Sequence, residues 1–188
     1  MGELKDYVGE FKKDVNLEDF SRGTLVRLFQ AAAKCYLGID GIWYSLIKER
    51  FGERVARDLE FELWSIATPK EVGRTMAAMN IQGDDVATVF KVLQCAPGTA
   101  GIMDFECGLK NRNHGILTVK RCSSLEYFER HRDLEGIKFA CDVMDRAMYP
   151  VTAQAVNPNI TVTPLKLPPR SSKDDIACQW EFRIDTTE

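Results

Sequence analysis

The 188-residue chain is poor in histidine, with only His114 and His131, and it lacks the short motifs of the common enzyme classes. It contains no phosphate-binding loop, no dinucleotide fingerprint, no GxSxG nucleophile and no HExxH zinc helix. Because histidine is a common general base and metal ligand, a well-built Cys–His catalytic pair is not expected. The sequence therefore names no reaction, and it leaves open whether the protein is an enzyme.

The sequence also lacks a long uninterrupted apolar run and an excess of basic charge. Its most apolar stretch, residues 31–47, is broken by Lys34, Gly38 and Asp40, so no membrane span is expected. A net charge of −3 gives no reason to expect nucleic-acid binding. The charged N-terminus has no signal-peptide pattern, and six cysteines without one indicate reduced thiols. We therefore expect a cytoplasmic protein with no membrane or nucleic-acid partner.

Apolar residues spaced by three and four predict helices in the first half of the chain. The first helix spans residues 21–51, between a Ser21 N-cap and Gly52, with a kink expected near Asp40. A second helix covers 53–67. The capping signal at 68–71, with a proline at its second position, predicts that a new helix starts there. A fourth helix follows residues 83–85 and ends before Pro97.

Alternating residues predict strands in the second half. Residues 101–110 and 115–121 flank the turn "NRNHG" as a hairpin, and a second hairpin combines residues 160–167 with 178–184. Helices are expected at 123–132 and 136–156. The order helices-hairpin-helices-hairpin predicts an α+β fold with helices packed on a small antiparallel sheet of about four strands. We expect an N-terminal extension, 1–20, and one domain, 21–188, with a helical half, 21–97, and a sheet-containing half, 98–188.

Three cysteines, Cys122, Cys141 and Cys178, lie at the boundaries of predicted elements in the second half. Boundaries at one end of a sheet can converge, so we expect their sulfurs within about 8 Å of one another, near enough for a shared zinc ion. His131 is a candidate fourth ligand. The alternative is that all three thiols are small buried apolar groups. The other three cysteines, Cys35, Cys95 and Cys107, are interpreted as core residues. His114 is interpreted as a solvent-exposed turn residue.

The stretch "GIDGIWY" places a carboxylate, Asp40, in an otherwise apolar helix, one turn before Trp43 and Tyr44. A carboxylate in that setting must be solvated, paired or hydrogen-bonded. One interpretation is a ligand-binding cavity between the first helix and the sheet, with these three residues and Trp180 as its binding residues. The alternative is that Asp40 bonds to a neighbouring helix.

The motifs "DGIWY", "ERFG", "RC", a cysteine nineteen residues later, and "C.WEF" resemble those of a group of uncharacterised prokaryotic proteins. That group is distantly similar to L-2-amino-thiazoline-4-carboxylate hydrolase-like proteins and to the 4-vinyl reductase domain family. The resemblance covers residues 25–182. The resemblance implies a structural zinc beside a ligand pocket. Cys122 and Cys178 match the first and last ligand cysteines of the 4-vinyl reductase domain family, whereas Cys141 matches only the group of uncharacterised prokaryotic proteins. Pro164 and Leu167 replace expected cysteines, so Glu126 would have to complete the ligand set.

Three functions follow as hypotheses. The first is a small-molecule-binding protein with a cysteine or zinc cluster beside its pocket. The second is a hydrolase for a small cyclic amide or thiazoline-like substrate. The third is an interaction module that forms a homodimer through an exposed sheet or helix face. An enclosed cavity of several hundred cubic ångströms favours the first two, a lowered thiol pKa favours the second, and a large apolar surface patch favours the third.

Overall fold

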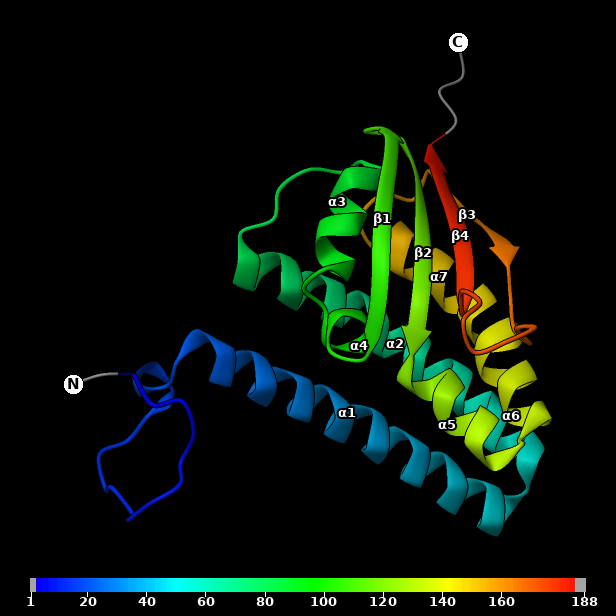
Figure 1. Ribbon diagram of the computed structural model, residues 1–188. Coiled ribbons are helices and arrows are strands. Elements are labelled where there is room, and N and C mark those ends of the chain that lie inside the picture. The colour runs from blue at the N-terminus through cyan, green and yellow to red at the C-terminus, as the bar shows by residue number, and fades with distance from the viewer. Residues whose placement is uncertain (1–2, 185–188) are drawn as a thin grey trace.

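A four-stranded antiparallel sheet forms one layer of the computed structural model, which describes residues 3–184 (Figure 1). The strand order is β1-β2-β4-β3, so the two hairpins meet through β2 and β4. This confirms the α+β class and the order of helices and hairpins. Residues 185–188 of the expected domain lie outside the described residues. The strands are β1 (Met103–Asn111), β2 (His114–Cys122), β3 (Ile160–Lys166) and β4 (Cys178–Ile184).

Two long helices, α1 (Arg22–Phe51) and α2 (Glu53–Met79), precede the sheet and form an antiparallel hairpin. Ser21 caps α1, because its side chain accepts a hydrogen bond from the Thr24 amide. Gly52 adopts a φ of 87°, a conformation that suits glycine, and reverses the chain. The helix α1 continues through Gly38 and Gly41 without interruption.

The prediction of a new helix at residue 68 is wrong, because α2 runs through Pro69. A proline inside a helix leaves the carbonyl four residues earlier without its helical partner. Here that carbonyl belongs to Ser65, which is exposed and can be hydrated. Thr68 and Val72 are buried on the inner side of the helix. Tertiary packing therefore maintains the helix across a local stop signal.

The remaining helices pack behind the sheet. The expected helix 136–156 is instead three consecutive segments, because a π-helical stretch, Lys138–Met144, separates α6 from α7. Such stretches are rare and are often found at functional sites. A short helix, α4, precedes β1 and was missed by the sequence pattern. The helices are α3 (Val86–Leu93), α4 (Pro97–Ala100), α5 (Ser123–His131), α6 (Leu134–Ile137) and α7 (Asp145–Gln154), and a 3₁₀ turn covers Leu17–Asp19.

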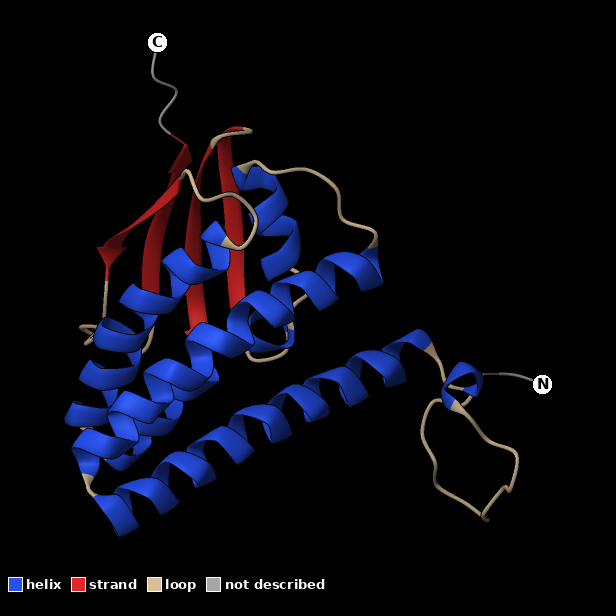
Figure 2. Cartoon of the chain, turned by 180° about the vertical axis from the view of Figure 1, so that it is seen from behind, coloured by secondary structure: helices blue, strands red, loops and turns tan. Residues whose placement is uncertain are grey.

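The main core lies between one face of the sheet and helices α3 and α7 (Figure 2). Trp180 and Phe182 of β4 are fully buried, as expected for the inward side of this strand. Tyr149 of α7 lies against Trp180, with ring centroids 4.6 Å apart. Gly115 of β2 leaves room for Phe90 of α3, since an added Cβ would lie 2.5 Å from the Phe90 ring. These contacts fix α3 and α7 on the sheet.

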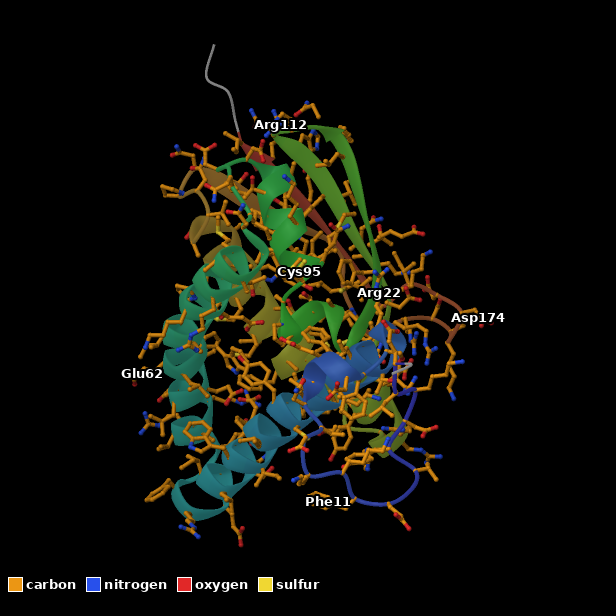
Figure 3. The ribbon with its side chains drawn as sticks, turned by 90° about the vertical axis from the view of Figure 1, so that its left-hand side faces the viewer. Phe11, Arg22, Glu62, Cys95, Arg112 and Asp174 are labelled. Atoms are coloured by element: carbon orange, nitrogen blue, oxygen red, sulfur yellow. The ribbon has the colours of Figure 1, made fainter. Side chains whose placement is uncertain are left out.

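The helix α1 lies at the outside of the molecule (Figure 2). Of its 30 residues, only Thr24 and Ala33 are buried. Ala33 sits against Gly101, where an added Cβ would come within 2.2 Å of the Ala33 Cβ. The far end of the sheet is marked by Arg112 at the β1–β2 turn (Figure 3). Within residues 3–184, no helix is long and apolar enough to cross a lipid bilayer.

Candidate functional site

Asp40 of α1 and Glu60 of α2 bring two carboxyl groups together between the helices. Glu60 is only 6% exposed, and its Oε1 accepts a hydrogen bond of 3.0 Å from the Trp64 indole. The Oδ1 of Asp40 and the Oε2 of Glu60 are buried and have no donor within the described residues. The helical hairpin brings Asp40 and Glu60 together, because α1 and α2 run antiparallel on either side of Gly52.

The pKa values of both carboxyl groups are raised. Burial raises the pKa of Glu60 to about 7, and the neighbouring Asp40 charge acts in the same direction. Burial also raises the pKa of Asp40, while hydrogen bonds from Glu60 and Trp64 oppose that shift. Two adjacent carboxylates cannot both ionise cheaply. A protonated Glu60 that donates to Asp40 satisfies both buried oxygens, which agrees with the alternative in which Asp40 bonds to a neighbouring helix.

The aromatic residues near Asp40 also pack onto helices. Tyr44 stacks on Phe139 of the π-helical segment, with ring centroids 5.6 Å apart. The Arg57 guanidinium lies 4.8 Å from the centre of the same Phe139 ring. Trp43 is half-buried on α1. Trp180, the fourth predicted ligand residue, is in the core of the sheet half, away from this helical hairpin.

The three predicted cluster cysteines converge at one end of the sheet. Cys122 ends β2, Cys178 begins β4 opposite Val119, and Cys141 belongs to the π-helical segment. All three are buried in the same core, and Cys122 lies near enough to raise the pKa of both Cys141 and Cys178. Asp145, the first residue of α7, lies beside them and adds a negative charge.

The thiols of this cluster are protonated at neutral pH. Burial raises the pKa of Cys178 to about 12, and Asp145 adds to the shift. The same causes raise the pKa of Cys122 and of Cys141 above the ordinary thiol value. Asp145 is partly exposed as a residue, but many atoms surround its carboxyl group. This burial raises the pKa of Asp145 to about 7. Because the thiolate is the reactive form, these cysteines are poor nucleophiles.

The residues around the cluster do not fit a zinc ion as they stand. In the described part of the chain, no three side chains of His, Cys, Asp or Glu are arranged to hold a metal ion. The two additional ligands considered from the sequence are engaged elsewhere. Glu126 accepts a bond of 2.9 Å from Arg121, and the Nδ1 of His131 donates to the Tyr127 carbonyl at 2.8 Å. We therefore derive no metal chemistry from this cluster.

Among the remaining histidine and cysteines, His114 and Cys35 differ from their predicted surroundings, whereas Cys107 packs against the main core as expected. His114 is not a free turn residue, because it begins β2 and its Nε2 lies 2.7 Å from Glu181 Oε1. Cys35 is exposed on α1 rather than buried in a core. Cys95 and Cys107 are half-buried. Burial raises the pKa of Cys107 to about 11.

Among the cavities on the described surface are two that the four predicted ligand residues do not line. The smaller, about 230 Å³, lies between α1 and the base of β1 and β2, where Lys34, Asp104, Arg121 and Glu126 make it polar. The larger has a volume of about 520 Å³. It is lined by Gln94, Phe105, Glu106, Cys107, Gly108, Ile116 and Thr118.

The outward face of α1 carries a stripe of exposed apolar residues, which we call the outer stripe. Its members recur at alternating spacings of three and four, the a and d positions of a coiled-coil heptad. Ile39 is 69% exposed and Ile42 is 64% exposed. From the sequence, Cys35 is interpreted as a core residue and the spacing of its apolar neighbours is used only to predict the helix, although a 3.5-residue period is the signal of pairing with a second helix. The outer stripe consists of Leu25, Leu28, Ala32, Cys35, Ile39, Ile42 and Leu46.

Comparison with known proteins gives a family without an activity. The model of DUF6125, a family of unknown function, matches residues 18–184. No curated protein and no solved structure matches the chain. The candidate function therefore depends on the residues themselves.

Proposed function

The chain belongs to the DUF6125 family of unknown function, and we propose that it is a dimeric interaction module that works through the outer stripe of α1. This is the third of the three functions considered from the sequence. The observation that carries it is the outer stripe, in which seven apolar side chains at heptad spacing are all exposed to solvent. Contiguous exposed apolar surface of this kind marks interaction sites.

The period of the outer stripe supports a helical partner. A 3.5-residue repeat keeps one apolar seam facing a second helix over several turns, whereas a partner of another shape needs no such repeat. At about 1.5 Å per residue, the stripe from Leu25 to Leu46 extends over roughly 30 Å. The outer stripe therefore suits a long helix.

The flanks of the outer stripe favour a second copy of the same chain. The e and g positions of a coiled coil select partners through their charges. Between Leu25 and Leu46 these positions carry no charged residue, so no charge pattern along the outer stripe selects a different helix. A self-complementary patch also forms the commonest kind of oligomer, a two-fold dimer. The flanking residues are Thr24, Phe29, Ala31, Tyr36, Gly38, Trp43 and Ser45.

The oligomeric state tests this proposal. Sedimentation equilibrium over a roughly hundredfold concentration range should show a dimer that dissociates on dilution. The substitutions Ile39→Glu and Ile42→Glu together should give a folded monomer, because two charges would be buried in the seam. Leu134→Glu is the matched control, since Leu134 of α6 is as exposed as Ile39, at 69%. This variant should remain dimeric.

Two results would contradict the dimer. One is a wild-type protein that stays monomeric at the highest concentration. The other is a double variant, Ile39→Glu with Ile42→Glu, that still dimerises with unchanged affinity. Circular dichroism of each variant separates loss of assembly from loss of fold, because a monomer with wild-type helix content has lost only the interface.

Small-molecule binding is a second candidate, supported by the cavity of about 520 Å³. That volume lies within the usual range of ligand sites. Phe105, Cys107 and Ile116 supply apolar walls, and Glu106 and Thr118 supply polar groups. Native mass spectrometry of protein from its own host would show a bound molecule, and Phe105→Ala should reduce its occupancy. The hydrolase suggested by the resemblance needs an activated nucleophile, which the protonated thiols do not supply.

A further inference from the structure

The outer stripe also contains information on the direction of the partner helix. We infer that two copies pair their α1 helices antiparallel, with Leu28, Ala32 and Cys35 of one copy facing Leu46, Ile42 and Ile39 of the other. This inference rests on the proposed dimer and specifies its partner geometry. The two-fold axis then passes near residue 37, at the middle of the stripe.

Side-chain size along the outer stripe supports the antiparallel direction. The smallest members, Ala32 and Cys35, lie in the N-terminal half of the stripe, whereas Ile39, Ile42 and Leu46 follow in the C-terminal half. A parallel pair would place alanine against alanine and leave a poorly filled layer, which costs stability. An antiparallel pair places each small residue opposite a large one, which is how well-packed interfaces fill their layers evenly.

Charge along α1 supports the same direction. Residues 22–34 contain three basic side chains, Arg22, Arg27 and Lys34, and no acidic one. Arg27 and Lys34 occupy c positions away from the seam, but parallel helices would still bring both basic segments to the same end of the dimer, where like charges oppose association. Antiparallel helices place the basic ends at opposite ends of the dimer. The inferred direction therefore avoids that repulsion.

Gly38 lies beside the inferred two-fold axis, where the two helices would approach most closely. A glycine inside an exposed helix costs about 1 kcal/mol relative to alanine. No atom of the described chain lies within 4 Å of a Cβ built on Gly38, so packing within the chain does not require glycine there. Ala31 and Ser45 occupy the equivalent heptad positions one repeat away on either side. This small-residue flank permits close contact between two α1 backbones.

Disulfide cross-linking distinguishes the two directions. In a Cys35→Ser background, we would compare Ala32→Cys alone, Ile42→Cys alone, and an equimolar mixture of the two single variants. In the inferred dimer, each position is about ten residues, or roughly 15 Å, from its own copy in the partner. A disulfide requires Cα atoms no more than about 7 Å apart. Mild oxidation should therefore cross-link only the mixture, and peptide mapping should join position 32 to position 42.

Each of the other outcomes would overturn a different part of the inferred dimer. Cross-linking of either single variant by itself, at the extent expected for the mixture, would show a parallel dimer and overturn the antiparallel inference while leaving the dimer intact. A protein that sediments as a dimer but does not cross-link in the mixture would overturn the register. A protein that sediments as a monomer would overturn the proposed function itself. Sedimentation of the same samples therefore separates the two failures.

Discussion

Asp40 on α1 and Glu60 on α2 interact across the helical hairpin, and the neighbouring Asp40 charge helps to raise the pKa of Glu60. A proton shared between them would satisfy two buried carboxyl oxygens, Oδ1 of Asp40 and Oε2 of Glu60, that have no other donor within the described residues. The interaction also ties the position of α1, which presents the outer stripe, to a titrating group. Substitutions at this pair therefore test the attachment of α1 to the rest of the molecule.

We expect Glu60→Gln to remove part of the pH dependence of stability. The folded pKa of Glu60 is about 7, above its usual 4.5, so the folded state binds the proton more tightly. The unfolding free energy of the wild type should therefore fall as the pH rises from 4.5 to about 7. The amide introduced by the substitution would donate to Asp40 at every pH, so the stability of the variant should fall less. Urea unfolding across this pH range measures the difference.

The control is Glu62→Gln, because Glu62 is exposed and points away from the molecule (Figure 3). The control should keep the wild-type pH dependence. A Glu60→Gln variant whose stability follows the wild-type curve throughout would show that the pair does not share a proton.

We expect Asp145→Asn to stabilise the protein at pH 8 by about 1–3 kcal/mol. Burial raises the Asp145 pKa from 3.8 to about 7, so the folded state loses stability as the pH rises through this range. An asparagine carries no charge to bury. Thermal unfolding at pH 5 and pH 8 should show a larger gain at pH 8, because the stability loss grows as the pH rises from 3.8 to about 7. Asp142→Asn is the control, because the partly exposed Asp142 pairs with Arg146 at 2.8 Å and its substitution should change stability little.

We expect the cluster thiols to react slowly with iodoacetamide. Cys122, Cys141 and Cys178 are buried and protonated, whereas Cys35 is exposed. In the monomeric Ile39→Glu, Ile42→Glu variant, Cys35 should be modified first, as peptide mass spectrometry would show. Rapid modification of a cluster thiol that disappears in His131→Ala would instead indicate an activated cysteine and favour catalysis.

We expect Gly101→Ala to destabilise the fold by about 1–3 kcal/mol or more. The added methyl would lie 2.2 Å from the Ala33 Cβ and 3.0 Å from the Pro97 carbonyl oxygen, so α1 would have to move. Ala33→Gly in the same chain should restore part of the loss by removing the closest clash. Chemical unfolding of the two single variants and the double variant gives the coupling energy. Strictly additive effects would show that this contact does not position α1.

The sequence determined the elements that depend on local chemistry. The three-and-four spacing from Ser21 to Gly52 predicts α1 correctly, because amphipathic periodicity and capping act within a few residues. Alternation around residues 112–113 predicts the first hairpin for the same reason. The second hairpin and its inward Trp180 and Phe182 also follow from alternation.

Only the tertiary structure decided the features that depend on distant partners. Pro69 continues α2 because buried neighbours outweigh a local stop signal. Glu60 meets Asp40 because a glycine turn reverses the chain between them, and no spacing rule links the two positions. Most of all, periodicity shows that α1 has an apolar stripe but not what covers it. Burial is a property of the whole packed molecule, and here packing leaves that stripe exposed.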